Sequence, residues 1–174
     1  MPSITLRPVR PDDEAFLFDL YASTRREEMA AWGLDEAMLA QLVEMQFAGQ
    51  QGTYHAQFPE ADHHLIVRDE QPIGRILVDR AEAQIVLVDV ALLPEARGGG
   101  IGTDLLRALQ NEAAEKGVPL RLKVLLTNPA RRLYQRLGFA GLGDDGVYEQ
   151  MEWRSEVDAR PSASEGKTDL TPDS

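Results

Sequence analysis

The stretch LPEARGGGIGT, residues 93–103, places three consecutive glycines and a fourth one two residues later between a strand-like and a helix-like segment. Residues 85–93 are almost continuously apolar, which predicts a central strand buried on both faces. After the glycines, apolar residues recur every four positions from Ile101 to Ala113, which predicts an amphipathic helix. Glycines let a ligand approach the backbone, and the unpaired N–H groups at a helix start favour negative charge. The stretch therefore predicts a phosphate-binding loop, and its alternative is a plain glycine-rich turn.

Two common nucleotide-binding loops do not fit this stretch. A dinucleotide fingerprint needs Gly-x-Gly-x-x-Gly, but the last position is Thr103 when counted from Gly98 and Leu105 when counted from Gly100. That fingerprint also needs an acidic residue at the end of the next strand, and residues 120–126 contain none. A Walker loop needs Gly-Lys followed by Ser or Thr, which is absent. The phosphate ligand is therefore expected to be of another kind.

A second block, NPARRLYQRLGF at residues 128–139, contains an Asn, then Leu-Tyr, then Gly-Phe. Together with the Arg-Gly-Gly-Gly-Ile-Gly sequence of residues 97–102, it resembles the two motifs of the GNAT superfamily of acyl-CoA-dependent N-acyltransferases. The order and the spacing of the blocks are typical of that family. The resemblance rests on residues 84–139, and the preceding segments fit the element order with little motif content.

The resemblance implies one α/β domain with a mixed, mostly antiparallel sheet, helices on both faces and the order β-α-α-β-β-β-α-β-α-β-β. The sequence pattern outside the motifs agrees with this order. Residues 25–32 show no clear period, and a helix that begins at Asp35 is expected to end near Gly49 and Gly52. The remaining predicted elements are a strand at 4–9, a helix from 11 to about 25, a hairpin at 64–68 and 73–78, a strand at 120–126, a helix at 128–137 and a closing hairpin at 139–142 and 147–153.

The length and composition predict one domain, residues 1–154, and a disordered acidic tail, residues 155–174. The net charge of −11 excludes nucleic acid and anionic membranes as partners and favours a cationic amine as acceptor. No cysteine is present, which fits a reducing compartment, and no apolar run approaches the roughly 18 residues that span a bilayer. A cytoplasmic protein is expected. No metal site is expected, because His63 and His64 point to opposite faces of a strand and His55 is remote.

For the cofactor, the resemblance implies acetyl-CoA, with coenzyme A as the product. Its pyrophosphate would lie on the backbone of Arg97, Gly98, Gly99, Gly100, Ile101, Gly102 and Thr103. Its pantetheine arm would pair with Val90, Ala91 and Leu92, where their strand splays away from residues 120–126. Asn128 would contact the cofactor near the pantetheine, although an Asn before a Pro is also a good helix cap in its own right.

The resemblance also implies direct attack of an acceptor amine on the thioester. Tyr134 stands where such enzymes place the acid that protonates the leaving thiolate, and its alternative role is to pack a helix face. Related enzymes often carry a glutamate base near the position of Gln84, and a glutamine cannot serve. Asp89 is the carboxylate inside that strand and the candidate base, unless it faces solvent or pairs with an arginine. In similar folds the helix-linking region walls the acceptor cleft, and here it contains Glu27, Glu28 and Trp32, whose alternative is a solvated turn.

The sequence thus predicts an N-acetyltransferase that acts on an amine of a small molecule or a protein in a ternary complex. The alternative is a GNAT-like domain that binds acyl-CoA, or a partner protein, without turnover. Gln84 favours the alternative, whereas Tyr134 and the intact glycine loop favour the enzyme. The resemblance also allows a homodimer.

Overall fold

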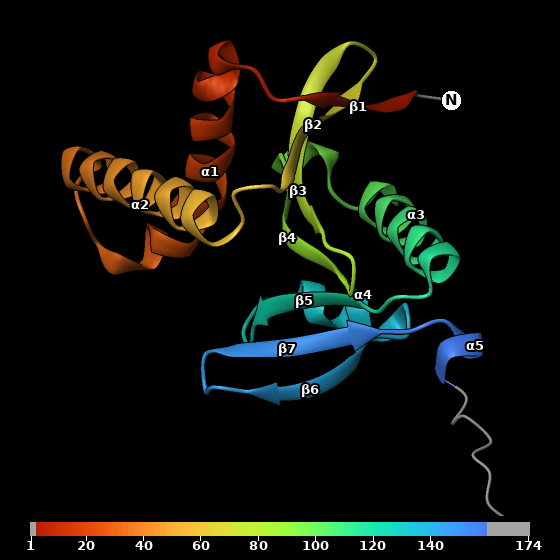
Figure 1. Cartoon of the computed structure of the whole chain (residues 1–174). Helices are drawn as coiled ribbons and strands as arrows, with labels where there is room; N and C mark the ends of the chain where they lie inside the picture. Colours follow the sequence, from red (N-terminus) through yellow and green to blue (C-terminus); the bar gives the residue numbers. More distant parts are fainter. Residues whose placement is uncertain (1–2, 160–174) are drawn as a thin grey trace, which may run out of the picture.

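The computed structural model describes residues 3–159, which form one seven-stranded sheet with helices on both faces (Figure 1). The strand order is β1-β2-β3-β4-β5-β7-β6, and each neighbouring pair is antiparallel except β4 and β5. The strands are β1 (Ile4–Pro8), β2 (Asp62–Arg68), β3 (Gln71–Arg80), β4 (Ile85–Leu92), β5 (Leu120–Leu125), β6 (Ala140–Asp144) and β7 (Tyr148–Trp153). The helices are α1 (Glu14–Met29), α2 (Glu36–Gln57), α3 (Ile101–Lys116), α4 (Ala130–Arg136) and α5 (Glu156–Ala159). The expected fold class and element order are confirmed.

Two apolar cores hold the layers together. Leu65 and Ile66 are neighbours on β2, and both side chains are fully buried because they point to opposite faces of the sheet. Leu65 packs in a cluster with α1 and α2, whereas Ile66 packs in a larger cluster with α3, α4 and the central strands. Figure 1 shows α1 and α2 on one side of β3 and β4, and α3 on the other.

The first two helices are longer than their sequence predicts. Helix α1 continues through the segment that shows no clear period, because Met29 is buried against α2, and a short 3₁₀ turn follows at Ala30–Trp32. Helix α2 passes through Gly49 and Gly52 and ends at Gln57, so the expected end near these glycines is wrong. Both glycines are exposed on the helix, and the buried side chains earlier in α2 hold it against α1 despite the helical cost of glycine.

The expected splay between the two parallel strands is confirmed. Strand β4 pairs with β5 only from Ile85 to Leu87, opposite residues 120–122. At the same point β4 contains a bulge, because Val78 on β3 lies opposite Leu87 and the preceding residue lies opposite Asp89, which leaves Val88 without a partner. A bulge bends its strand and changes the direction of the following side chains. Beyond Val88 the two strands diverge, and their facing backbone groups are not paired with each other.

The end of the described chain differs from expectation. The prediction of disorder for residues 155–174 is wrong for Glu156–Ala159, which form the short helix α5, and the rest of the predicted tail lies outside the described residues. Within residues 3–159, no helix combines the length and the apolar character that crossing a membrane requires.

Candidate active site

A cavity of about 180 Å³ lies where β4 and β5 diverge. The walls include backbone and apolar side chains of both strands and polar side chains from four further elements or their ends. Four residues predicted from the sequence are brought together in its lining: Asp89, Val90, Asn128 and Tyr134. The other polar lining residues are Arg25, Gln50, Tyr54, Lys123 and Tyr148.

Tyr134 lies on α4, and its ring packs edge-on against Phe139 with the ring centroids 5.7 Å apart. The residue is 7% exposed. Burial, reinforced by the negative charge of Asp89, raises the pKa of the Tyr134 hydroxyl to about 12. The hydroxyl therefore keeps its proton at neutral pH, which suits a proton donor. Because the residue both packs the core and lines the cavity, the two roles weighed for it are compatible.

Asn128 connects the end of β5 to α4. Its side-chain Oδ1 accepts a hydrogen bond from the backbone N–H of Ala130, the first residue of α4, at 2.9 Å, while Pro129 holds the N-cap position. Asn128 also lines the cavity. Asn128 thus binds the start of α4 from one position before the expected N-cap, and a cofactor contact by Asn128 stays a prediction.

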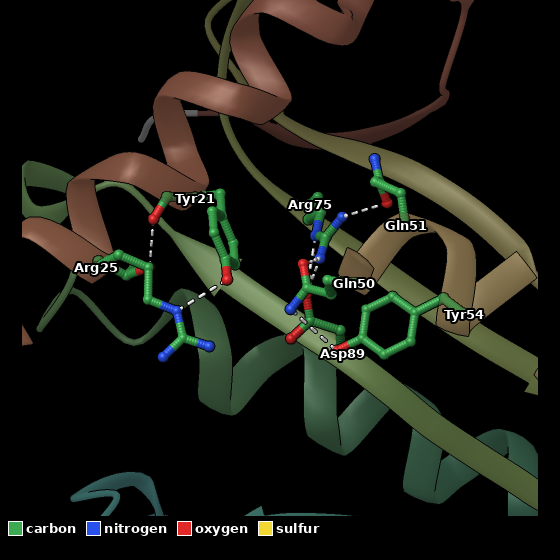
Figure 2. A network of polar contacts seen from close by, with 8 residues as sticks. Tyr21, Arg25, Gln50, Gln51, Tyr54, Arg75 and Asp89 are labelled. Atoms are coloured by element: carbon green, nitrogen blue, oxygen red, sulfur yellow. Dashed lines mark hydrogen bonds and ion pairs between the residues drawn. The ribbon is translucent and has the colours of Figure 1, made fainter. Parts of the chain in front are cut away.

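Asp89 forms an ion pair with Arg75, a residue on β3 whose side chain is 4% exposed (Figure 2). Nε and one terminal nitrogen of Arg75 contact the same carboxylate oxygen, Oδ2, at 2.8 and 2.6 Å. Among the described residues, no hydrogen bond reaches Oδ1 of Asp89. Of the arrangements that the sequence leaves open for Asp89, the structure has the arginine pair, and the carboxylate still lines the cavity.

Arg75 also binds the second half of α2. Its guanidinium donates to Oε1 of Gln50 at 2.8 Å and to Oε1 of Gln51 at 3.4 Å. The same guanidinium lies 5.7 Å from the ring centroid of Tyr54, whose hydroxyl accepts a hydrogen bond from Gln50 at 3.3 Å. Burial and the negative charge of Asp89 raise the pKa of Tyr54. Figure 2 shows these α2 side chains grouped around the Arg75–Asp89 pair.

Sequence reasoning missed Gln50, Tyr54 and Arg75. Gln50 lies between the two glycines that were expected to end the helix, and Tyr54 lies beyond them. Arg75 lies in a hairpin strand whose register the sequence pattern does not give. A usable signal is present for α2, because Phe47, Gln50 and Tyr54 continue the helical steps of three and four residues. Arg75 becomes recognisable only when β3 is placed beside β4.

The glycine loop lies between β4 and α3 and is open toward solvent. Gly98 and Gly100 have φ values of +79° and +86°, a left-handed conformation that favours glycine. A Cβ added at either residue, or at Gly99 between them, would meet no atom within 4 Å. Arg97 ties the loop down, because its Nε donates to the backbone oxygen of Leu92 at 3.1 Å. The loop thus presents backbone at the N-terminus of a 16-residue helix, with space in front of it for a phosphate group.

The predicted acceptor residues Glu27, Glu28 and Trp32 do not line the cavity. Glu27 pairs with Arg97 at 3.4 Å, and Glu28 pairs with Arg25 at 2.9 Å. Trp32 is 60% exposed at the end of the turn after α1. Their role in acceptor binding stays a prediction.

Comparison with known proteins gives one family. Residues 59–140 match the family model described as the acetyltransferase (GNAT) domain. A segment of 75 residues is 36% identical to the [ribosomal protein bS18]-alanine N-acetyltransferase of Haemophilus influenzae, covering 42% of this chain and 51% of that protein. The chain thus spans about half the length of the curated relative that it matches.

Solved structures share the fold over most of the chain. The PaiA N-acetyltransferase of Thermoplasma acidophilum, solved in complex with coenzyme A, has a TM-score of 0.67 at 21% identity, covering 88% of this chain and 99% of that one. An acetyltransferase from Thermus thermophilus has a TM-score of 0.62 at 22% identity, covering 88% and 97%. At these identities the likeness concerns the fold.

Proposed function

We propose that the chain transfers an acetyl group from acetyl-CoA to an amine of a small molecule or a protein, because residues 59–140 match the acetyltransferase (GNAT) domain model. One observation carries this proposal: the cavity with Tyr134, Asp89 and Asn128 opens where β4 leaves β5, on the strand that leads into the glycine loop. A plain glycine-rich turn would need no such cavity beside it.

The residues around the strand opening fit acetyl-CoA, which would supply the acetyl group as a thioester. The backbone N–H groups of residues 97–103 would hold its pyrophosphate, because the loop is open and lies at a helix N-terminus. The backbone of Val90, Ala91 and Leu92 would pair with the pantetheine arm, since this part of β4 has no partner on β5. Asn128 would contact the same arm from the start of α4.

The reaction forms one bond between the amine nitrogen and the acetyl carbon and breaks the bond between that carbon and sulfur. One proton leaves the nitrogen and one reaches the sulfur. Tyr134 would give the sulfur its proton, since its raised pKa keeps the hydroxyl protonated. Asp89 would receive the proton from nitrogen through Oδ1, because Oδ2 is already occupied by Arg75. Holding both substrates in line would supply much of the remaining rate gain.

Thermal melting with acetyl-CoA, coenzyme A, ATP and NAD in parallel tests cofactor binding. A ligand at 100 times its dissociation constant stabilises a fold by about 2.7 kcal/mol, which for this size is a rise of about 5–10 °C. We expect that rise with the first two ligands alone. Gly99→Glu should abolish it, because a carboxylate would face the pyrophosphate where a side chain meets no protein atom. Gly52→Glu, on the exposed face of α2, is the charge-matched control.

Release of coenzyme A in the presence of a panel of amines then tests turnover. Binding of acetyl-CoA without release for any amine would favour the alternative, a binding domain without catalysis. No melting shift with acetyl-CoA or coenzyme A would overturn the proposed function itself.

A further inference from the structure

The charges that line the cavity have the opposite balance to the chain as a whole. The whole chain carries a net charge of −11. The cavity is lined by two cations, Arg25 from α1 and Lys123 from β5, and by one carboxylate, Asp89. The charge of that carboxylate is offset by the buried Arg75 behind it. The cationic acceptor that the overall charge favours therefore does not match the charge at this site.

Arg25 is fixed in place by its neighbours. Its Nε donates to the hydroxyl of Tyr21 at 3.0 Å, and its guanidinium carbon lies 5.2 Å from the Tyr21 ring centroid. Figure 2 shows Tyr21 between Arg25 and the Arg75–Asp89 pair. The ion-pair partner of Arg25 is Glu28, whose side chain is 55% exposed and lies outside the cavity lining. An exposed partner is screened by water and salt, so Arg25 keeps a cationic character toward the cavity.

Lys123 approaches from the opposite wall. Its ammonium lies 5.7 Å from the ring centroid of Tyr148, and among residues 3–159 it has no ion-pair partner. Lys123 and Tyr148 also line a second cavity of about 250 Å³ at the β6–β7 hairpin, together with Asp144 and Asp145. Each of these two carboxylates already accepts hydrogen bonds from backbone N–H groups of the hairpin turn. Within the cavity between β4 and β5, the ammonium of Lys123 and the guanidinium of Arg25 thus face one carboxylate, that of Asp89.

We propose that the acceptor is a small amine that carries a carboxylate close to its amino group, as free amino acids do. This inference rests on the proposed acetyl transfer. The amino group would lie beside Oδ1 of Asp89, and the carboxylate would bind between Arg25 and Lys123 through charge-assisted hydrogen bonds. The volume of about 180 Å³ is below the ~300 Å³ at which sites for drug-sized ligands begin, which limits the part of the acceptor inside it to a small group.

The test compares the twenty amino acids with their amides in the coenzyme A release assay. Amidation removes the carboxylate and keeps the amine, but it also lowers the pKa of the amine, so rates are compared at equal concentrations of unprotonated amine. For the preferred side chain we expect kcat/KM to be about 10- to 100-fold higher for the acid than for the amide, the range of one or two hydrogen bonds between charged groups.

Two variants test whether Arg25 and Lys123 cause the preference for the acid over the amide. Arg25→Gln and Lys123→Gln should each lower the acid-to-amide ratio by about tenfold, chiefly through KM for the acid. Arg26→Gln removes the same charge from the exposed neighbour of Arg25 on α1, and Lys116→Gln removes an exposed lysine on α3. Both controls should keep the wild-type ratio. Melting with acetyl-CoA is measured for all four variants, so that loss of cofactor binding is seen separately.

The possible outcomes distinguish the preference for a carboxylate-bearing acceptor from acetyl transfer itself. An acid-to-amide ratio near one, or acetylation confined to amines without a carboxylate, overturns the inference and leaves the acetyltransferase intact. The same holds for a protein that binds acetyl-CoA and acetylates none of the twenty acids. An unchanged acid-to-amide ratio in both Arg25→Gln and Lys123→Gln would contradict binding of the acceptor carboxylate by these cations. Weaker acetyl-CoA binding in these variants, with an unchanged ratio, would mean that the two cations bind the cofactor instead. No cofactor binding and no turnover of any amine would remove the function as well.

Discussion

At the scale of single residues, Tyr134 is the proposed acid. Tyr134→Phe should lower kcat by about 100-fold and leave the KM for acetyl-CoA nearly unchanged, because the variant loses the proton and keeps the packing against Phe139. Since the pKa of Tyr134 is raised to about 12, wild-type kcat should not fall through loss of this proton between neutral pH and about pH 10. Steady-state kinetics across this pH range measure both effects. A variant with full kcat would remove Tyr134 from the mechanism.

The lowered pKa of His63 predicts how the folding stability depends on acidic pH. Burial and the charge of Arg75 lower its pKa from 6.5 to about 4, so the folded protein holds this ring neutral while the unfolded chain protonates it. Folding stability should therefore fall as the pH drops from about 6.5 to about 4, by roughly 1–3 kcal/mol from this residue. Urea unfolding at both ends of that range should show a smaller loss for His63→Gln than for the wild type. His55→Gln, on the exposed end of α2, should behave like the wild type.

At the scale of elements, substituting alanine for Gly74 on β3 and for Gly52 on α2 should change the folding stability in opposite directions. A Cβ at Gly74 on β3 would lie 2.3 Å from the backbone oxygen of Ala91 on β4. Gly74→Ala should therefore destabilise the fold by about 1–3 kcal/mol and weaken acetyl-CoA binding, because β4 must move. Gly52→Ala meets open space within a helix and should stabilise the fold by about 0.5–1 kcal/mol. Denaturant unfolding of both variants measures the contrast, and equal effects would mean that β4 yields easily at Ala91.

The elements also show what the sequence could predict. The strand, the loop and α3 were predictable because apolar period and glycine placement act within a short segment. Helix α2 was not, since its tertiary contacts outweigh the intrinsic preference of Gly49 and Gly52. The cavity needed the register of β3 against β4, which brings Arg75 to Asp89 across 14 positions of sequence. A sequence pattern within β3 or β4 alone does not predict how the two strands align with each other.

At the scale of the whole molecule, the sheet has two parts joined through three residue pairs of β4 and β5 and through the shared core on the α3 face. If the pantetheine arm pairs with β4, acetyl-CoA should slow amide hydrogen exchange at residues 88–92. Leu65 and Ile66, on a strand that is paired on both sides, should change little. Exchange measured by mass spectrometry with and without acetyl-CoA tests this, and unchanged exchange at residues 88–92 would contradict the assignment.

The divergence of β4 from β5 also affects how readily the protein aggregates during storage. Unpaired strand edges are templates on which other chains add strands, and most proteins keep such edges short or charged at the rim of a sheet. Here one lies in the middle of the sheet, and residues 90–92 on it are apolar. We expect preparations that lack acetyl-CoA to aggregate on storage, and saturating acetyl-CoA to act as a protective cover. Shelf life should then follow cofactor occupancy more closely than buffer composition.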